Sequence, residues 1–299
     1  MKCEFPMSLG RGGAFACGHC FSCRLNRRRE LQHRIMLEAS CHKENAFVTL
    51  TYEDAKLPLN ATGVGTLRPS DLQNFLKRLR SRLAPLRIRF FGVGEYGEVT
   101  MRPHFHVAIF GFPHCQRLLM ERRIPCCSVC TMIGNAWGIG HVQVGSLTPD
   151  SSQYIAGYTV KKMTSFDHPK LDGRFPEFAR WSGGLGKGAM WDVASTLLAL
   201  DFSEPDVPSG LRYNGNKILP FGRYLRRELR AMMGRSRNAP QETIDAMAAE
   251  VQPLWETWWD ATSIKWRSES FTKTLSLLRE GDAASVASRF GVSRKRRSL

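Results

Sequence analysis

Residues 102–110 read Arg-Pro-His-Phe-His-Val-Ala-Ile-Phe, and this stretch decides the fold. Its apolar run and the turn residues after it predict a strand over His104–Phe110. Side chains two residues apart in a strand point to one face, so His104 and His106 project together while Phe105 turns toward the core. Two imidazoles about 6–7 Å apart on one face can share a divalent metal ion. Two surface histidines without a metal fit the same pattern, and the motif alone leaves both interpretations open.

The segments on either side of this stretch predict further strands and helices. Strands are expected over Phe47–Tyr52, whose residues alternate and are β-branched, over Ile88–Glu95 and over His141–Val144. Helices are expected over Phe21–His42, over Ser70–Leu83 with Ser70 as the N-cap, and over Gln153–Met163. Residues 164–188 are rich in Gly and Pro and are expected to form a loop.

The pattern changes after Asp201. Pro205, Pro208 and Gly210 indicate a linker, and helices are expected over residues 222–233, 241–258 and 268–279. Residues 293–299 form a basic tail. We therefore expect one domain over residues 1–200, which includes a Cys-containing basic N-terminal segment, and a mostly helical C-terminal region over residues 201–299.

The charge balance narrows the class of partner. Lys and Arg total 43 against 27 acidic residues, which gives a formal net charge of +16. A basic protein favours a polyanionic partner, because neutralising phosphates releases condensed counterions. The basic residues also cluster, for example over Arg24–Arg34 and Arg223–Arg237. Nucleic acid is the favoured partner; a solvated basic surface and binding to anionic lipid are the alternatives.

The nine cysteines raise the question of a metal. The chain has no apolar run of about 18 residues and no secretory signal pattern at its start, so we expect no membrane partner, an intracellular protein and no disulfide framework. Cys17, Cys20 and Cys23 are three residues apart, with Cys3 upstream, and Cys126, Cys127 and Cys130 form a second group after Cys115. Thiolates at this spacing can point at one Zn²⁺ ion, but neither group has four ligands unless a remote residue joins. A structural zinc site and reduced, unliganded cysteines both fit.

The segment Tyr154-Ile-Ala-Gly-Tyr158-Thr-Val-Lys161-Lys162 places two tyrosines four residues apart. On a helix they share one face, and Lys161 falls between them in angle. Two phenols and a cation on one face suit phosphoryl transfer, in which a phenol attacks phosphorus and the cation balances charge. A tyrosine pair packed on the core beside a lysine fits equally well.

A glycine-rich segment, Gly183-Gly-Leu-Gly-Lys187-Gly188, invites comparison with a phosphate-binding loop. Trp181 stands where the first glycine is needed, and Gly188 stands where Ser or Thr would hold magnesium. The segment is therefore not an ATPase signature.

Taken in order, these motifs resemble the HUH endonuclease superfamily in its two-tyrosine, rolling-circle-replication branch. More narrowly, the chain resembles replication-initiation proteins of microviruses, the gokushovirus group especially. The matching segments are Cys17–Cys23, Phe47–Tyr52, Gly94–Glu98 leading into Arg102–His106, and Tyr154–Lys162.

The resemblance implies a mechanism. His104 and His106 would bind Mg²⁺ or Mn²⁺, and a third ligand would be Glu95, or else Glu98. Tyr154 and Tyr158 would cut and rejoin the origin strand through a 5′-phosphotyrosine ester, so that no ATP is needed. Lys161 is the motif lysine.

The resemblance also implies an α+β fold with a central antiparallel sheet and packed helices. The partners it implies are single-stranded origin DNA and the helicase and polymerase of a bacterial host, in whose cytoplasm the protein would act. Lys162, Arg102, Arg27 and Arg28 are expected to contact DNA.

Two other classes remain. A transposase or relaxase would use the same chemistry. A zinc-stabilised basic protein could instead bind single-stranded nucleic acid without cutting it, and could stack bases on Trp255, Trp258, Trp259 and Trp266. Metal-dependent covalent attachment to DNA separates an enzyme from a binding module.

Overall fold

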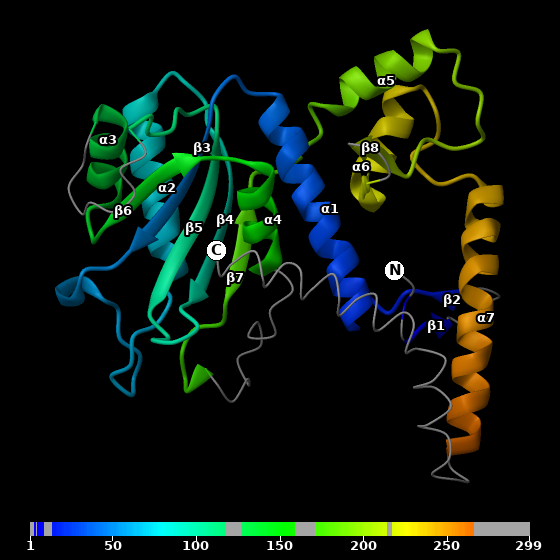
Figure 1. Cartoon of the computed structure of the whole chain (residues 1–299), viewed down its shortest axis with the longest axis horizontal. Coiled ribbons are helices and arrows are strands. Elements are labelled where there is room, and N and C mark those ends of the chain that lie inside the picture. Colours follow the sequence, from blue (N-terminus) through cyan, green and yellow to red (C-terminus); the bar gives the residue numbers. More distant parts are fainter. Residues whose placement is uncertain are drawn as a thin grey trace. The chain divides into compact units, whose positions relative to one another are not determined.

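The computed structural model describes residues 3, 5–8, 14–117, 127–158, 171–213 and 217–265. The chain divides into two compact units (Figure 1). One comprises Met1–Arg27, Glu204–Asp206 and Asn238–Leu299, and the other comprises Arg28–Ser203 and Val207–Arg237. Residues 207–237 thus cluster with the unit that contains the sheet. The expected boundary between residues 200 and 201 stays a prediction.

The second unit is built on a five-stranded antiparallel sheet. Its strands lie in the order β6-β3-β5-β4-β7, and each strand is antiparallel to its neighbours. Their bounds are Asn45–Thr51 for β3, Arg89–Tyr96 for β4, Pro103–Phe110 for β5, Val142–Ser146 for β6 and Phe178–Trp181 for β7. The predicted α+β class with a central antiparallel sheet is confirmed.

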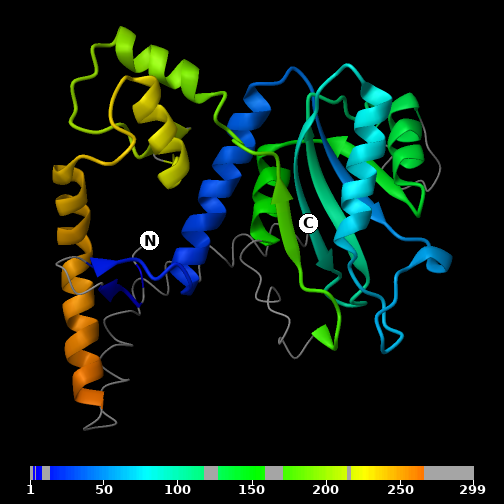
Figure 2. The same cartoon turned by 180° about the vertical axis from the view of Figure 1, so that it is seen from behind.

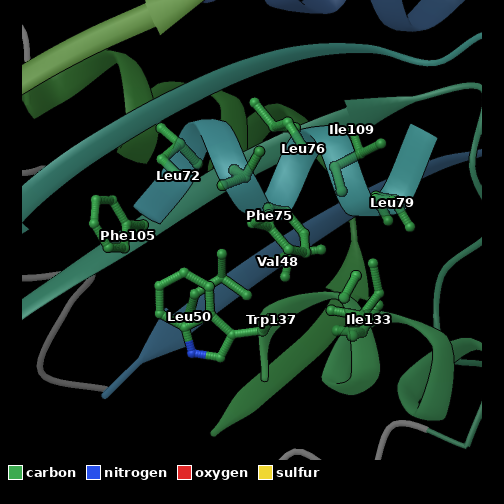
Figure 3. Packing of buried hydrophobic residues seen from close by; sticks show 14 of the residues in the cluster. Val48, Leu50, Leu72, Phe75, Leu76, Leu79, Phe105, Ile109, Ile133 and Trp137 are labelled. Carbon is green, nitrogen blue, oxygen red and sulfur yellow. The ribbon is translucent and has the colours of Figure 1, made fainter. Parts of the chain in front are cut away.

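Helices cover both faces of the sheet. On one face lie α2 (Pro69–Leu83) and α3 (Ser128–Trp137), whose apolar side chains meet those of β3 and β5 (Figure 3). Figure 2 shows α2 running across this face. On the other face lie α1 (Phe21–Ser40) and α4 (Pro149–Gly157), where Ile155 and Ala156 pack on Phe91 and Val93. The alternation of side chains along the strands produces these two layers.

Side-chain hydrogen bonds tie helices to the strands. Trp137, at the end of α3, is fully buried and donates its indole N–H to the Thr51 carbonyl at 2.8 Å. Glu38 of α1 is also buried, pairs with Arg89 of β4 and accepts from the Gly186 amide at 2.7 Å. Burial opposes ionisation of Glu38, but the hydrogen bonds from Arg89, Gly186 and His42 outweigh it and lower its pKa.

Two predicted helix starts are wrong. Ser70 is not the N-cap of α2: Arg68 takes that position and Pro69 is within the first turn. Proline suits a first turn because its fixed φ is helical and its missing N–H would have no partner there. For the same reason α4 begins at Pro149 rather than at Gln153, capped by Thr148, which accepts from the Ser151 amide.

The segment expected to be a loop over residues 164–188 contains the strand β7 in its described part. This strand is four residues long and pairs with β4 alone, at the edge of the sheet. A strand so short and so close to glycines shows little periodicity in the sequence. The pairing with β4 is what creates it.

The rest of this unit forms a second small core. It contains α5 (Met190–Ala199), the antiparallel pair β8 (Gly210–Tyr213) and β9 (Lys217–Pro220), and α6 (Gly222–Met232). Apolar residues of α5 and α6 pack together with Leu37 of α1. The helix predicted over residues 222–233 is confirmed, but a strand pair stands where part of the linker was expected.

The first unit contains β1 (Met7–Ser8), β2 (Ala14–Phe15), the start of α1, and α7 (Gln241–Lys265), which contacts β2. The helix predicted over residues 241–258 is confirmed and is longer than expected. The helix predicted over 268–279, the basic tail and Trp266 lie outside the described residues. In the part of the chain that the structure describes, no helix combines the length and apolarity needed to cross a membrane.

Candidate active site

The register of three strands assembles the site on the α1 and α4 face of the sheet. Within β5, His104 lies opposite Glu95 of β4, and His106 lies opposite Thr49 of β3. Because cross-strand partners on one face are close neighbours, the two histidines are flanked by a carboxylate on one side and a hydroxyl on the other. Phe105 points to the opposite layer and packs against Trp137.

Glu95 joins the two histidines. Its Oε1 lies 2.7 Å from His104 Nε2 and 3.0 Å from His106 Nε2. One ligand atom from each of the three residues lies within 4.8 Å of the other two. Glu95 is 2% exposed, whereas Glu98, the other residue considered for this role, is exposed in the turn after β4. The structure therefore brings Glu95, and not Glu98, to the histidine pair.

The carboxylate is held in its charged form. Burial opposes ionisation of Glu95, but the hydrogen bonds from both imidazoles outweigh that effect and lower its pKa to about 2. The site thus contains a buried anion facing two nitrogen ligands. Such a mixed set of two imidazoles and one carboxylate is suited to a divalent metal ion.

The far nitrogens of the imidazoles are also bound. His104 Nδ1 lies 3.1 Å from the Arg102 carbonyl, which can only accept, so Nδ1 donates. His106 Nδ1 lies 3.0 Å from Thr49 Oγ1. Contacts of this kind fix the ring orientation and leave Nε2 as the ligand atom. Thr49 was not among the residues predicted from the sequence. Alternation places it on a definite face of its strand, but only the register places it opposite His106.

Both tyrosines of the predicted pair contact His106. Tyr154 Oη lies 3.4 Å from His106 Nε2, and its ring is nearly perpendicular to the imidazole at 5.2 Å. The Tyr158 ring stacks on the same imidazole at 5.7 Å with an interplanar angle of 16°. Tyr158 is the C-cap of α4 rather than an interior residue, but its φ of −68° and ψ of −24° are helical. The two phenols therefore share a face, as the spacing predicted.

The predicted cations are placed unevenly. Lys161 and Lys162 lie outside the described residues. Arg28 of α1 lies beside the last turn of α4, since a Cβ on Gly157 would sit 3.6 Å from its Nε. Arg27 is exposed on α1. Arg102 donates to the Tyr52 carbonyl at 2.7 Å and pairs with the exposed Asp54.

The cysteines form two clusters. Cys17, Cys20 and Cys23 gather with Cys3, which supplies the fourth sulfur that the sequence spacing lacked. Cys115, Cys127 and Cys130 form the other cluster, and Cys126 lies outside the described residues.

Comparison with known proteins places the chain among phage proteins. Residues 45–163 match a family of replication-associated proteins of the ORF2 type. The chain is 34% identical over 176 residues to the Replication-associated protein ORF2 of Spiroplasma virus 4, covering 57% of this chain and 55% of that protein. It is 35% identical over 165 residues to the Replication-associated protein VP4 of Bdellovibrio phage phiMH2K, covering 50% and 49%. It is 30% identical over 155 residues to the Replication-associated protein ORF4 of Chlamydia phage 1, covering 49% and 38%. The chain is a relative of the replication-associated proteins of microviruses.

The part that matches the replication-associated protein family contains the site just described. Residues 45–163 include β3, β4, β5 and α4, and with them both histidines, Glu95 and both tyrosines. Cys3–Cys23 and the arginines of α1 fall outside the match. The chain spans about half the length of the curated relatives it matches.

Proposed function

We propose that the chain is a replication initiator that nicks single-stranded origin DNA by tyrosine attack, forms a 5′-phosphotyrosine ester, and re-ligates. This would start rolling-circle replication of a small phage genome. One observation carries the proposal: the Tyr154 hydroxyl lies 3.4 Å from His106 Nε2, and His106 contacts the buried Glu95 together with His104. A nucleophile beside a three-ligand site is what metal-assisted phosphodiester transfer requires.

Mg²⁺ or Mn²⁺ would be held by His104, His106 and Glu95. The donor set fits, because the three ligand atoms lie within 4.8 Å of one another and the carboxylate is ionised. The carboxylate suits both ions, while two imidazole ligands favour Mn²⁺ over Mg²⁺, which prefers oxygen. When bound, such an ion polarises the non-bridging oxygens of the phosphodiester.

The residues of the chain carry the transfer itself. The Tyr154 oxygen would attack phosphorus, and the bond from phosphorus to the 3′ oxygen would break. The phenol gives up its proton, the released 3′ oxygen gains one, and the 5′ end stays on the protein as a phosphotyrosine. Tyr158 would attack after one round, and the freed 3′-OH would then displace a tyrosine in re-ligation. The number of phosphoester bonds is conserved at each step, so no ATP is required.

Cations near the tyrosines would position the strand. Arg28 lies beside the last turn of α4, and we propose that it contacts the phosphate next to the cut, with Arg27, Arg102, Lys161 and Lys162 as further DNA contacts. The net charge of +16 favours such binding. The host helicase and polymerase would supply unwinding and synthesis in the bacterial cytoplasm, since the sequence contains no phosphate-loop signature.

The test is a covalent adduct. The purified protein is incubated with circular single-stranded DNA of its source replicon and Mn²⁺, and protein–DNA adducts are resolved on a denaturing gel. We expect an adduct that EDTA abolishes, as does the double variant His104→Ala with His106→Ala. The matched control is Tyr213→Phe, which removes a phenol that contacts His33 and not the site.

Single tyrosine variants then assign the two roles. We expect Tyr154→Phe to remove the first adduct, because its hydroxyl already reaches His106. Tyr158→Phe should form the first adduct and fail to transfer the strand in the second step. DNA binding with no adduct in any metal would contradict the proposal and favour a binding protein that does not cut.

A further inference from the structure

Four thiols converge at the start of the chain. Cys3 precedes β1, Cys17 follows β2, and Cys20 and Cys23 lie at the start of α1. All four Sγ atoms lie within 4.8 Å of one another. Cys3, Cys20 and Cys23 are buried, and Cys17 packs against them. Because only Cys17, Cys20 and Cys23 are close in sequence, the fold is needed to bring Cys3 to them.

The spacing between the sulfurs fits a metal and excludes disulfides. Cys3 Sγ lies 3.9 Å from Cys20 Sγ, and Cys17 Sγ lies 4.0 Å from Cys23 Sγ. A disulfide requires about 2.05 Å. Four thiolates at about 2.3 Å from a tetrahedral Zn²⁺ ion lie about 3.8 Å apart, because the edge of a tetrahedron is about 1.6 times the distance from its centre to a corner. Both observed separations are near that edge.

Backbone amides point at the sulfurs. Cys3 Sγ accepts from the Cys17 amide at 3.2 Å, and Cys17 Sγ accepts from the amides of His19 and Cys20 at 3.4 and 3.3 Å. Cys20 Sγ accepts from the Cys23 amide at 3.4 Å. Hydrogen bonds to a sulfur stabilise its charged form, which is the form that binds metal. The loop before α1 is therefore folded around the sulfur atoms.

The local structure has little else to hold it. The strands β1 and β2 are two residues each, and the buried cluster that joins them to α1 consists of cysteines. Phe5, Met7 and Phe15 are 45%, 50% and 49% exposed, so the apolar side chains here do not form a core. Pairs of such short strands are marginal without a staple.

We propose that Cys3, Cys17, Cys20 and Cys23 bind one structural Zn²⁺ ion. With four protein ligands the site is closed, so it has no position for a substrate and is not catalytic. It ties β1 and β2 to the first turn of α1, the helix that carries the Arg-rich segment. This proposal is independent of the nicking mechanism, because none of the four residues lies in the sheet or in α4.

The second cysteine cluster is not part of this inference. Among the residues that the structure describes, Cys115, Cys127 and Cys130 supply three sulfurs rather than four. Zinc bound there would add to a total metal content. The experiment therefore measures differences between variants.

The test compares the zinc content of the full-length protein with that of three single variants. Protein is produced with added zinc, and metal per chain is measured by mass spectrometry after gel filtration. Cys3→Ser should contain one Zn²⁺ fewer than the wild type. Cys3→His should keep the ion, because a three-cysteine, one-histidine site also binds zinc. The matched control is Cys41→Ser, which changes an exposed cysteine outside the cluster and should leave the content unchanged.

A second readout does not depend on how Cys3→Ser folds. Wild-type protein reconstituted with Co²⁺ should show the strong visible bands of a tetrahedral thiolate site, and Cys3→His should shift them. Circular dichroism and the DNA adduct assay report separately on the sheet-containing unit. Equal zinc in wild type and Cys3→Ser, or wild-type protein with neither zinc nor a tetrahedral Co²⁺ spectrum, would overturn the proposal.

Discussion

The hydroxyl of Thr49 offers the sharpest test of how the histidine pair is oriented. Its Oγ1 lies 3.0 Å from His106 Nδ1, on the side of the ring away from Glu95. Thr49→Val keeps the shape of the side chain and removes the hydrogen bond. The His106 ring then loses the contact that fixes its orientation, and we expect weaker binding of Mn²⁺ at Nε2.

The size of the effect follows from the kind of hydrogen bond lost. A hydrogen bond to a group that carries positive charge, as an imidazole bound to a divalent ion does, is worth about 1.5–3 kcal/mol. At about 1.4 kcal/mol per tenfold change, the dissociation constant should rise about 10- to 100-fold. Thr49 is half-buried, so water can replace part of the bond and the lower end of this range is expected.

The assay is a Mn²⁺ titration of the metal-free protein, with free Mn²⁺ measured by electron paramagnetic resonance. Thr51→Val is the matched control: it removes a hydroxyl from the same strand, but that hydroxyl donates to the His141 carbonyl and not to an imidazole. Thr49→Ser should bind nearly as wild type. If Thr49→Val binds Mn²⁺ within twofold of the control, packing on Phe47 orients His106 and the hydroxyl does not.

Three further predictions concern DNA binding, acid stability and packing. Arg28→Ala should weaken single-stranded DNA binding, and should lower the slope of log affinity against log salt by about 0.7 if one phosphate contact is lost; an unchanged slope would place the arginine away from DNA. Glu38→Gln should destabilise the protein at pH 7 by about 2–3 kcal/mol, below the about 3–5 kcal/mol of a fully buried pair, because its arginine partner is 34% exposed. The folded-state pKa of Glu38 lies below the reference value of 4.5, so its contribution is complete above that pH and is lost as pH falls through the folded pKa. Chemical denaturation from pH 7 to 3 should therefore show a smaller loss of stability in Glu38→Gln than in wild type, and parallel curves would contradict this. Gly140→Ala should cost about 3 kcal/mol in thermal unfolding, because the new Cβ would lie 2.0 Å from the Thr51 carbonyl oxygen, whereas Gly183→Ala, which meets nothing within 4 Å, should change stability little.

The central layer of the fold could be predicted because its signal is local. Period-two alternation over Phe47–Tyr52 and His104–Phe110 predicted two neighbouring strands of the sheet and set which side chains share a face. The same period placed His104 and His106 together. The four-residue spacing likewise placed Tyr154 and Tyr158 on one face of α4.

What the sequence could not supply was register. Glu95 and Glu98 were both reasonable ligands, and the pairing of β4 with β5 decides between them by placing Glu95 opposite His104. Thr49 and Cys3 went unassigned for the same reason, since their partners are 57 and 14–17 residues away in the chain. A contact over such a distance leaves no periodic trace in the sequence.

One imidazole contacted by two phenols is the feature that connects this fold to the proposed reaction. Repeated cutting and joining requires each tyrosine to reach the same phosphate site. Tyr154 meets His106 edge-on at 5.2 Å and Tyr158 stacks on it at 5.7 Å, so both start within one side chain's reach of the ligand set. His106 is itself fixed by β5, whose neighbours on both sides are hydrogen-bonded strands. The ligands therefore form the stationary part, and an exchange between the two tyrosines needs only rotation of side chains at the end of α4, not movement of the metal ligands.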